Sequence, residues 1–325
     1  MIDGRVFLKV VALVLWFSFG LWGTASAQYP SKPVRLISPF PPGGGVDAIA
    51  RIVANALSED LGQAIIVENH GGAGGRIGTE IAAKSAPDGY TLLLGSVGPN
   101  AIIPSAYQNL PYDAINSFSP VSVVGRSAYA LTVPANSPAK NVNDLIALAK
   151  ARPGALDFAS TGNLGGPHLA GELFKNLASI KAVHVPYKGG GPMITALLSG
   201  EVSFAFVSLP TVVPHMKAGT LRVLAITATE RSSTMPDVPT VAEFLPGYEV
   251  LQWYGILAPA QTPLTIVTKL HDEIVKVVNL PKVRAQLASS DTDPFTNSPG
   301  AFQAQIKNEL SKYRTLIEKA AIRIE

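Results

Sequence analysis

The sequence predicts an α/β protein whose parallel-rich sheets are covered by helices, and three observations support this prediction. Strand-like and helix-like runs alternate along the chain, as they do in βαβ units. Several strand-like runs, among them 90–94 and 221–226, are almost continuously apolar, which is typical of strands buried on both faces. The length of 325 residues exceeds what one hydrophobic core usually holds, so we expect two domains.

The expected strands are short apolar runs bounded by residues that favour turns. Gly, Pro or a charged residue interrupts each run within about ten residues, as expected for strands of globular domains. The expected strands span residues 34–40, 64–68, 90–96, 121–125, 129–133, 157–161, 183–187, 202–207 and 221–227.

Apolar residues at helical spacing predict the helices. In the first helix, Ile49, Ile52 and Val53 lie on one face. Ser298 and Pro299 offer an N-cap and a first-turn proline to the last one. The other expected helices open at Arg76 and at His168, cover residues 193–198, and carry the stripe Val267, Leu270, Ile274 and Val277.

The N-terminal segment is typical of a secretory signal peptide. Arg5 and Lys9 precede an apolar run over residues 10–22, and the small residues 25–27 form the pattern that signal peptidase cleaves. The run is shorter than the roughly 20 apolar residues that a membrane span requires. We therefore expect residues 1–27 to be removed, so that a soluble periplasmic protein begins at Gln28.

The composition excludes several classes of site. The chain has no cysteine, which excludes disulfides, thiolate metal sites and a lipid-anchoring cysteine. The net charge is only +3 and no basic run is present, so nucleic acid is not an expected partner. The 5 histidines form no HExxH pattern and no i, i+4 pair, and we expect neither a metal nor a cofactor.

The glycines Gly43, Gly44 and Gly45 are the most informative feature, because they lie between an expected strand and an expected helix. Without a Cβ, this backbone allows a ligand oxygen to approach closely, and the free N–H groups at a helix N-terminus favour an anion. A plain strand-to-helix turn is the alternative interpretation. The glycine run thus predicts an anion pocket at this turn.

Three further glycine-rich segments, at 69–75, 161–167 and 187–192, also precede expected helices. In open α/β sheets, ligands bind beyond the carboxyl ends of the strands, where such loops gather. In a two-domain protein that place is the cleft between the domains. We therefore expect the four loops to share one binding site.

An α/β enzyme that uses a nucleotide or hydrolyses its substrate is the alternative function. Residues 43–48 fit the dinucleotide pattern G-x-G-x-x-A, and Glu68 follows at a suitable distance for a ribose. Prolines 39, 41 and 42 interrupt the tight turn that this pattern requires. Ser96 lies one position away from the G-x-S-x-G pattern of a nucleophile elbow, so we expect no catalytic residue.

From Tyr29 to the C-terminus, the chain resembles the Bug-type extracytoplasmic solute receptors, the substrate-binding components of tripartite tricarboxylate transporters. The motifs that carry this resemblance follow one another along the whole mature chain. They are YPSKPVR at 29–35, PFPPGGG at 39–45, APDGYTL at 86–92, LPYD at 110–113, HLAGELF at 168–174, HVPYKG at 184–189, PDVPT at 236–240 and LAP at 257–259.

The resemblance implies a type II periplasmic-binding-protein fold, in which two α/β lobes joined by two crossing strands close on a solute. We expect the crossings near residues 125–129 and 248–255. We expect residues 28–126 and 250–325 to form lobe 1 and residues 127–249 to form lobe 2. The implied ligand is a small organic acid, a mono- or dicarboxylate, and the implied protein is a monomeric receptor without enzymatic activity. Its expected partner is a membrane permease or a sensor kinase.

The resemblance also implies how the ligand is held, namely by backbone N–H groups, hydroxyls and bridging water from the glycine-rich loops. Relatives often carry an aspartate where this chain has Val207, so we expect Val207 to line the pocket and the ligand to lack an amine. The candidate ligand-binding residues are Gly43, Gly44, Gly45, Asp47, Ala73, Gly74, Ser96, Asn100, Ser160, Thr161, Gly162, Asn163, His168, Val207 and Ser208.

Overall fold

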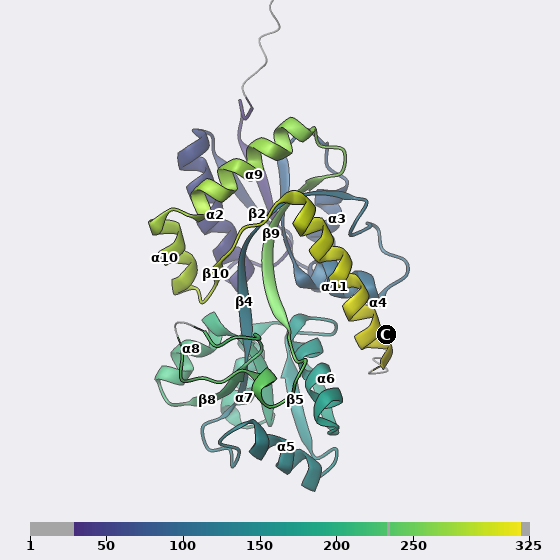
Figure 1. Cartoon of the computed structure of the whole chain (residues 1–325), viewed down its shortest axis with the longest axis vertical. Coiled ribbons are helices and arrows are strands. Elements are labelled where there is room, and N and C mark those ends of the chain that lie inside the picture. Colours follow the sequence, from purple (N-terminus) through teal and green to yellow (C-terminus); the bar gives the residue numbers. More distant parts are fainter. Residues whose placement is uncertain (1–28, 233–234, 320–325) are drawn as a thin grey trace, which may run out of the picture. The chain divides into compact units, whose positions relative to one another are not determined.

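The computed structural model describes residues 29–232 and 235–319 (Figure 1), so the predicted signal peptide at 1–27 lies outside the described residues. The helices and strands below all belong to one unit of the chain, Lys32–Glu325. Within the described part, no helix is long and apolar enough to span a bilayer.

The first lobe is built on a parallel sheet with β1 at its centre. β1 pairs with β2 on one side and with β3 on the other, and α2 and α3 form the two crossovers of this βαβ arrangement. The antiparallel strand β9 extends the sheet beyond β3. Its elements are β1 (Val34–Ser38), α2 (Gly45–Leu61), β2 (Ile65–Asn69), α3 (Arg76–Ala83), β3 (Thr91–Ser96), α4 (Ile103–Ala106), β9 (Leu251–Pro259), α9 (Leu264–Val278), α10 (Pro281–Ser289), β10 (Asp293–Pro294) and α11 (Pro299–Lys319).

The second lobe repeats this design with β5 at the centre, flanked by the parallel strands β6 and β7. The aromatic rings of Phe158, Phe174 and Phe204 pack against one another in its core. The elements of this lobe are α5 (Val142–Ala151), β5 (Leu156–Ser160), α6 (Gly166–Ala178), β6 (Ala182–Pro186), α7 (Gly190–Ser199), β7 (Phe204–Ser208), α8 (Leu209–Lys217) and β8 (Leu221–Ile226).

One long strand, β4 (Phe118–Pro134), belongs to both sheets. It pairs with β9 as far as Ala128 and with β7 and β8 further along, and all of these pairings are antiparallel. The prediction of two separate strands at 121–125 and 129–133 was wrong, because Gly125 does not interrupt the strand. Its missing side chain lets Thr292 pack against the backbone, where a Cβ would collide with the threonine methyl group.

The sheets are therefore mixed, although the sequence favoured parallel pairing. The parallel pairs lie within the βαβ units of each lobe, as predicted, and the antiparallel pairs all involve β4 or β9. The strand β9 was expected only as a crossing near residues 248–255. Because β4 and β9 run in opposite directions beside one another, they connect the lobes as a two-stranded ribbon.

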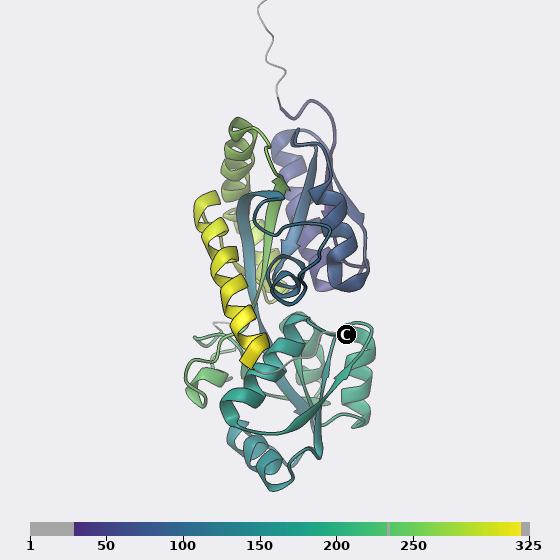
Figure 2. The same cartoon turned by 90° about the vertical axis from the view of Figure 1, so that its right-hand side faces the viewer.

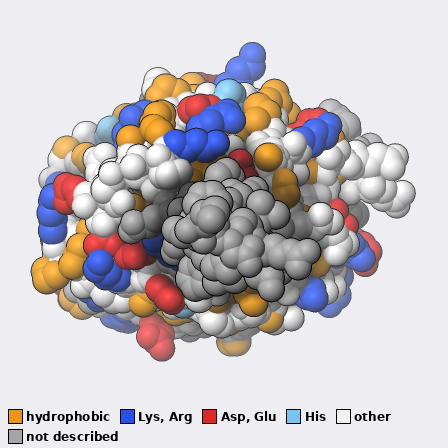
Figure 3. Space-filling model, turned by 90° about the horizontal axis from the view of Figure 1, so that it is seen from above, with side chains coloured by type: hydrophobic (Ala, Val, Ile, Leu, Met, Phe, Trp, Pro, Cys, Tyr) orange, Lys and Arg blue, Asp and Glu red, His pale blue; other side chains and the backbone are white. Residues whose placement is uncertain are grey.

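The surface carries charges of both signs close together. On the face seen in Figure 3, lysines and arginines lie among acidic side chains. Ion pairs join the helices of the first lobe, for example Lys276 of α9 to Asp60 of α2, and Lys282 of α10 to Glu59 of α2. Such exposed pairs contribute little to stability, but they neutralise the basic groups of these helices.

Helix α11 packs along β4 and β9, as Figure 2 shows for β4, and Phe302 meets the ring of Trp253 edge-on at 5.1 Å. The indole Nε1 of Trp253 donates a hydrogen bond to Glu309 Oε2 at 2.6 Å, and Gln305 donates to the other carboxylate oxygen. Burial raises the pKa of Glu309 to about 7, although these hydrogen bonds and Lys312 oppose the rise. The folded state therefore binds this proton more tightly than the unfolded chain does.

We predict that Glu309→Gln stabilises the protein at pH 8 and changes little at pH 5. Because the folded pKa of Glu309 is raised to about 7, wild-type stability falls as the pH rises from about 4.5 to 7. The neutral amide avoids this loss, which is on the order of 3 kcal/mol. Thermal unfolding of both proteins between pH 5 and 8 measures this difference in stability. The exposed Glu318→Gln on the same helix is the control, and equal pH profiles for Glu309→Gln and wild type would contradict the prediction.

Candidate functional site

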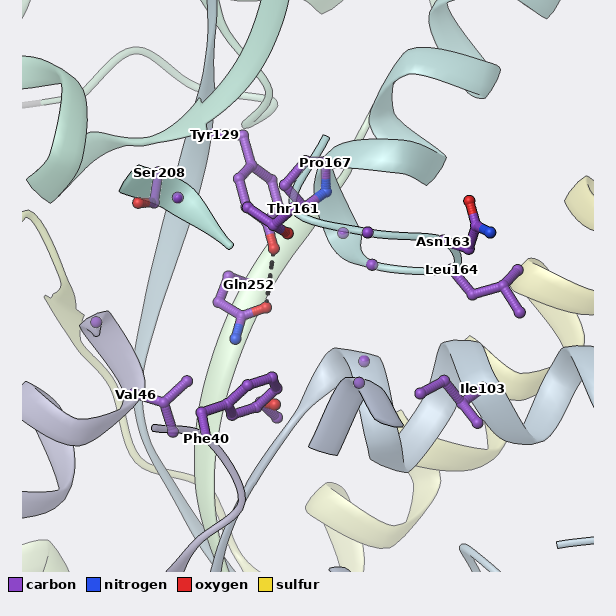
Figure 4. A pocket seen from close by; sticks show the side chains of 18 of the residues that line it. Phe40, Val46, Ile103, Tyr129, Thr161, Asn163, Leu164, Pro167, Ser208 and Gln252 are labelled. Carbon is purple, nitrogen blue, oxygen red and sulfur yellow. Dashed lines mark hydrogen bonds between the residues drawn. The ribbon is translucent and has the colours of Figure 1, made fainter. Parts of the chain in front are cut away.

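A cavity of about 510 Å³ lies between the loops of the two lobes (Figure 4). The loops that follow β1, β3, β5 and β7 all reach it, so the carboxyl ends of parallel strands from both lobes meet there. Figure 4 shows Phe40 and Val46 on one side and Thr161 and Ser208 on the other. The gathering of glycine-rich loops from both lobes is the arrangement that the sequence predicted.

The first lobe contributes a largely apolar wall with a few polar groups. Phe40 and Ile103 supply apolar surface, and Ser96 comes from the end of β3. Behind this wall, Asn100 Oδ1 accepts a hydrogen bond from the backbone N–H of Ser96. The lining residues of this lobe are Phe40, Gly45, Val46, Ala73, Gly74, Arg76, Ser96, Gly98, Ile103 and Tyr107.

The second lobe contributes hydroxyl groups and a loop of exposed backbone. Residues 161–165 connect β5 to α6, and the hydroxyls of Ser208 and Thr211 lie 2.7 Å apart. None of the lining side chains that the structure describes in this lobe is charged. The lining residues of this lobe are Thr161, Gly162, Asn163, Leu164, Gly165, Gly166, Pro167, Gly190, Met193, Ser208 and Thr211.

The two connecting strands form the floor of the cavity. Tyr129 of β4 donates a hydrogen bond from its hydroxyl to Gln252 Oε1 of β9 at 3.0 Å, and Tyr254 lies further along β9. Burial raises the pKa of Tyr129 and of Tyr254 well above the usual range, so both phenols stay protonated. Gly166 packs against the Tyr129 hydroxyl so closely that a Cβ would collide with it. The floor is thus rigid and neutral.

The loop after β5 rests on two histidines, of which His168 is buried and His184 is half-buried. His168 and His184 stack with their ring centroids 3.8 Å apart, and His168 Nδ1 accepts a hydrogen bond from the Leu164 backbone N–H. Ser160 Oγ lies 2.6 Å from His184 Nε2 and also bonds to Gly162. Burial lowers the pKa of His168 to about 3 and that of His184 to about 4. Both rings are therefore uncharged at neutral pH, and they support the loop from below.

Leu164 brings this loop into contact with the other lobe. Its φ of 57° is in the left-handed region, which a bulky residue adopts only under constraint from its surroundings. The side chain is only 3 % exposed and belongs to the core cluster that contains Ile103 of the first lobe. The strained backbone thus places an apolar side chain of the second lobe against the first lobe, beside the cavity.

Asp47 fixes the loop after β1. Its carboxylate accepts hydrogen bonds from the Gly43 backbone N–H, from Arg51 and from Asn69. Burial opposes ionisation, but these hydrogen bonds prevail and lower the pKa of Asp47. Glu68, which a dinucleotide enzyme would use to hold a ribose, forms a bidentate ion pair with Arg35 instead. The carboxylate of Glu68 is thus already paired between β1 and β2.

The predicted site residues fall into three groups. The first group lines the cavity, and the second lies directly behind it. Val207 belongs to neither group. The lining group comprises Gly45, Ala73, Gly74, Ser96, Thr161, Gly162, Asn163 and Ser208, and the supporting group comprises Gly43, Asp47, Asn100, Ser160 and His168. Gly44 also belongs to neither group, because it is exposed and lies outside the lining.

Val207 lies in the core of the second lobe, which corrects the expectation that it lines the pocket. It is fully buried and pairs with Ala130 in the β4–β7 register. Side chains alternate between the faces of a strand, so the neighbouring Ser208 faces the cavity while Val207 faces away. The inference from Val207 that the ligand lacks an amine therefore loses its basis.

Sequence reasoning missed Arg76, Tyr129 and Gln252, all of which line the cavity. Arg76 directly follows the glycine-rich segment 71–75. Its position next to a candidate loop was the signal that could have identified it as a lining residue. Tyr129 and Gln252 carried no such signal, because each lies within a strand that the sequence treated as a connection between lobes. Within the described residues, no group of three or more His, Asp or Glu is placed to hold a metal ion.

Two α/β lobes joined by crossing strands, with a cavity where their loops meet, define the class of two-lobed solute-binding proteins. Comparison with known proteins identifies the family. The chain belongs to the tripartite tricarboxylate transporter family receptors, which it matches over residues 49–322. This confirms the predicted fold and the prediction of a non-enzymatic receptor.

Individual relatives agree with this assignment. Protein BugT of Bordetella pertussis is 36% identical over 309 residues, covering 94% of this chain and 95% of its own length. The structure of R. palustris Rpa4515 with adipate is 33% identical with a TM-score of 0.84, covering 90% of this chain and 98% of that one. MatC from Rhodopseudomonas palustris with bound malate is 28% identical with a TM-score of 0.80, and the match covers 89% of this chain and 100% of that one.

We predict that Val207→Ala lowers the free energy of unfolding by about 2 kcal/mol, because it removes a buried side chain and leaves a cavity. Chemical denaturation measures this loss. Val183→Ala is the matched control, since Val183 is a strand valine with 54% of its surface exposed, and its replacement should cost under 0.5 kcal/mol. Equal stability of the two variants would show that Val207 is not a core residue.

Proposed function

We propose that this protein is a periplasmic receptor that holds a small carboxylate, a mono- or dicarboxylic acid, in the cavity between its lobes. The observation that carries the proposal is the cavity itself, which is lined by backbone and hydroxyl groups of both lobes and by one arginine. The adipate and malate complexes of similar proteins support the same class of ligand. The signal-peptide pattern before Gln28 supports export.

The lobes proposed for this function are residues 28–126 with 250–325, and residues 127–249. The change of β4 from the first sheet to the second between Ala128 and Tyr129 supports the first boundary. The start of β9 at Leu251 supports the second. In this proposal the protein works as a monomer and delivers its ligand to a membrane permease of the tripartite tricarboxylate type.

The proposed ligand contacts are the lining residues of the glycine-rich loops. In the second lobe, the hydroxyls of Thr161 and Ser208 and the backbone of residues 162–166 offer neutral hydrogen-bond donors. In the first lobe, Ser96 Oγ is buried and has no hydrogen-bond partner among the described residues. A buried hydroxyl without a partner is costly, so a ligand oxygen at Ser96 would satisfy it.

Two measurements test this function. Mass spectrometry of protein purified from the periplasm should detect an organic acid that dissociates on unfolding. Thermal unfolding with adipate, malate and benzoate, each in large excess over the protein, should show a rise in melting temperature for at least one of them. Absence of both signals would overturn the proposal.

We predict that Gly45→Val abolishes carboxylate binding while the protein still folds. Gly45 is the first residue of α2, and its Cβ would lie 3.5 Å from the Tyr254 hydroxyl, so a valine side chain would project into the cavity. Gly44→Ala is the control, because Gly44 lies outside the lining and its Cβ would meet only Pro41 O at 3.8 Å. Titration calorimetry with the acid found above measures both, and unchanged affinity in Gly45→Val would place the ligand elsewhere.

A further inference from the structure

Arg76 is the one charged side chain among the described residues that line the cavity. It begins α3, directly after the glycines of the second loop, and it is half-buried. Its guanidinium lies over the ring of Tyr107, with 5.3 Å between Cζ and the ring centroid. Tyr107 lines the cavity as well, so the stacked pair belongs to its wall.

The positive charge of Arg76 has no acidic partner among the residues that the structure describes. Every ion pair seen there uses other side chains, and the buried Nε of Arg76 has no hydrogen-bond partner. Other arginines near the loops are paired: Arg51 with Asp47, and Arg35 with Glu68. A partly desolvated cation without a partner is unfavourable, and an anion in the cavity would relieve this.

The surroundings of Arg76 restrict what that anion can carry. The described lining contains no aspartate or glutamate, so an ammonium group in the cavity would find no counter-charge and would be repelled by the guanidinium. Phe40, Ile103 and Met193 supply apolar surface for the body of a ligand. These features favour an acid with an apolar body.

The two lobes also differ in the charge that they bring to the cavity. Arg76 belongs to the first lobe, whereas the polar groups in the described lining of the second lobe are only hydroxyls, one amide and backbone groups. Charge-assisted hydrogen bonds are about twice as strong as neutral ones. One carboxylate of the ligand therefore has a much stronger anchor than any second polar group.

We propose that Arg76 determines the specificity of this receptor: it pairs with one carboxylate of the ligand and excludes acids that also carry an ammonium group. The inference rests on the proposed function, since it concerns the same cavity.

The test compares wild type with Arg76→Gln, Arg76→Lys and Arg126→Gln. The first variant removes the charge, the second keeps it, and the third is a matched control, because Arg126 also stacks on an aromatic ring, Phe295, but lies outside this cavity. The probes are adipate, malate, benzoate and 2-aminoadipate, which is adipate with an added ammonium group. Titration calorimetry at 0.05 and 0.5 M salt measures the dissociation constants.

For the acid that binds wild type most tightly, we expect Arg76→Gln to weaken binding at least tenfold, which corresponds to about 1.4 kcal/mol. Arg76→Lys should lose less, and Arg126→Gln should bind as wild type does. Wild type should bind 2-aminoadipate at least tenfold more weakly than adipate. High salt should weaken binding to wild type but not to Arg76→Gln, because salt screens an ion pair.

The outcomes separate the two proposals. If no acid binds wild type and none is carried through purification, the proposed function fails. If an acid binds wild type and a folded Arg76→Gln binds it equally well, the role of Arg76 fails while the function stands. Should Arg76→Gln not fold, the salt dependence and the comparison with 2-aminoadipate decide with wild type alone. Salt-independent binding, or equal affinity for 2-aminoadipate and adipate, would then overturn the inference.

Discussion

The continuity of β4 is the constraint on which the rest of the structure depends. Its 17 residues exchange hydrogen bonds with β9 in one sheet and with β7 and β8 in the other. Because the strand is unbroken, the carboxyl ends of the parallel strands in the two lobes face one another. Tyr129 lies where the partners change, and it becomes part of the cavity floor. The binding site is therefore a consequence of the connection between the lobes.

The cavity wall depends on buried polar groups that do not themselves line it. Asp47 holds the loop after β1, Asn100 holds the end of β3, and His168 with His184 supports the loop after β5. Asp47, Asn100 and His168 each accept a hydrogen bond from a backbone N–H, and His184 bonds to the hydroxyl of Ser160. A rigid support lets the glycine-rich backbone remain exposed to a ligand without collapsing, which preorganises the site.

The distribution of charge in the cavity connects this geometry to function. Nearly all the lining is neutral, the tyrosines of the floor keep their protons, and the histidines behind the loop are uncharged. In such surroundings a single arginine dominates the local field, because few other charges screen it. Family membership accounts for the two-lobed fold, and the position of Arg76 in the cavity lining accounts for the charge of the cavity.

The sequence alone determined the α/β class, the glycine-rich loops and their convergence, because turn residues and apolar periodicity are local signals. Its motifs also led to the correct family. Only the tertiary structure decided that Gly125 continues a strand, that Val207 faces the core, and that Arg76 and Tyr129 reach the cavity. The reason is physical: the face that a side chain occupies depends on strand register and on the elements packed against it, and both are set by residues far away in the chain.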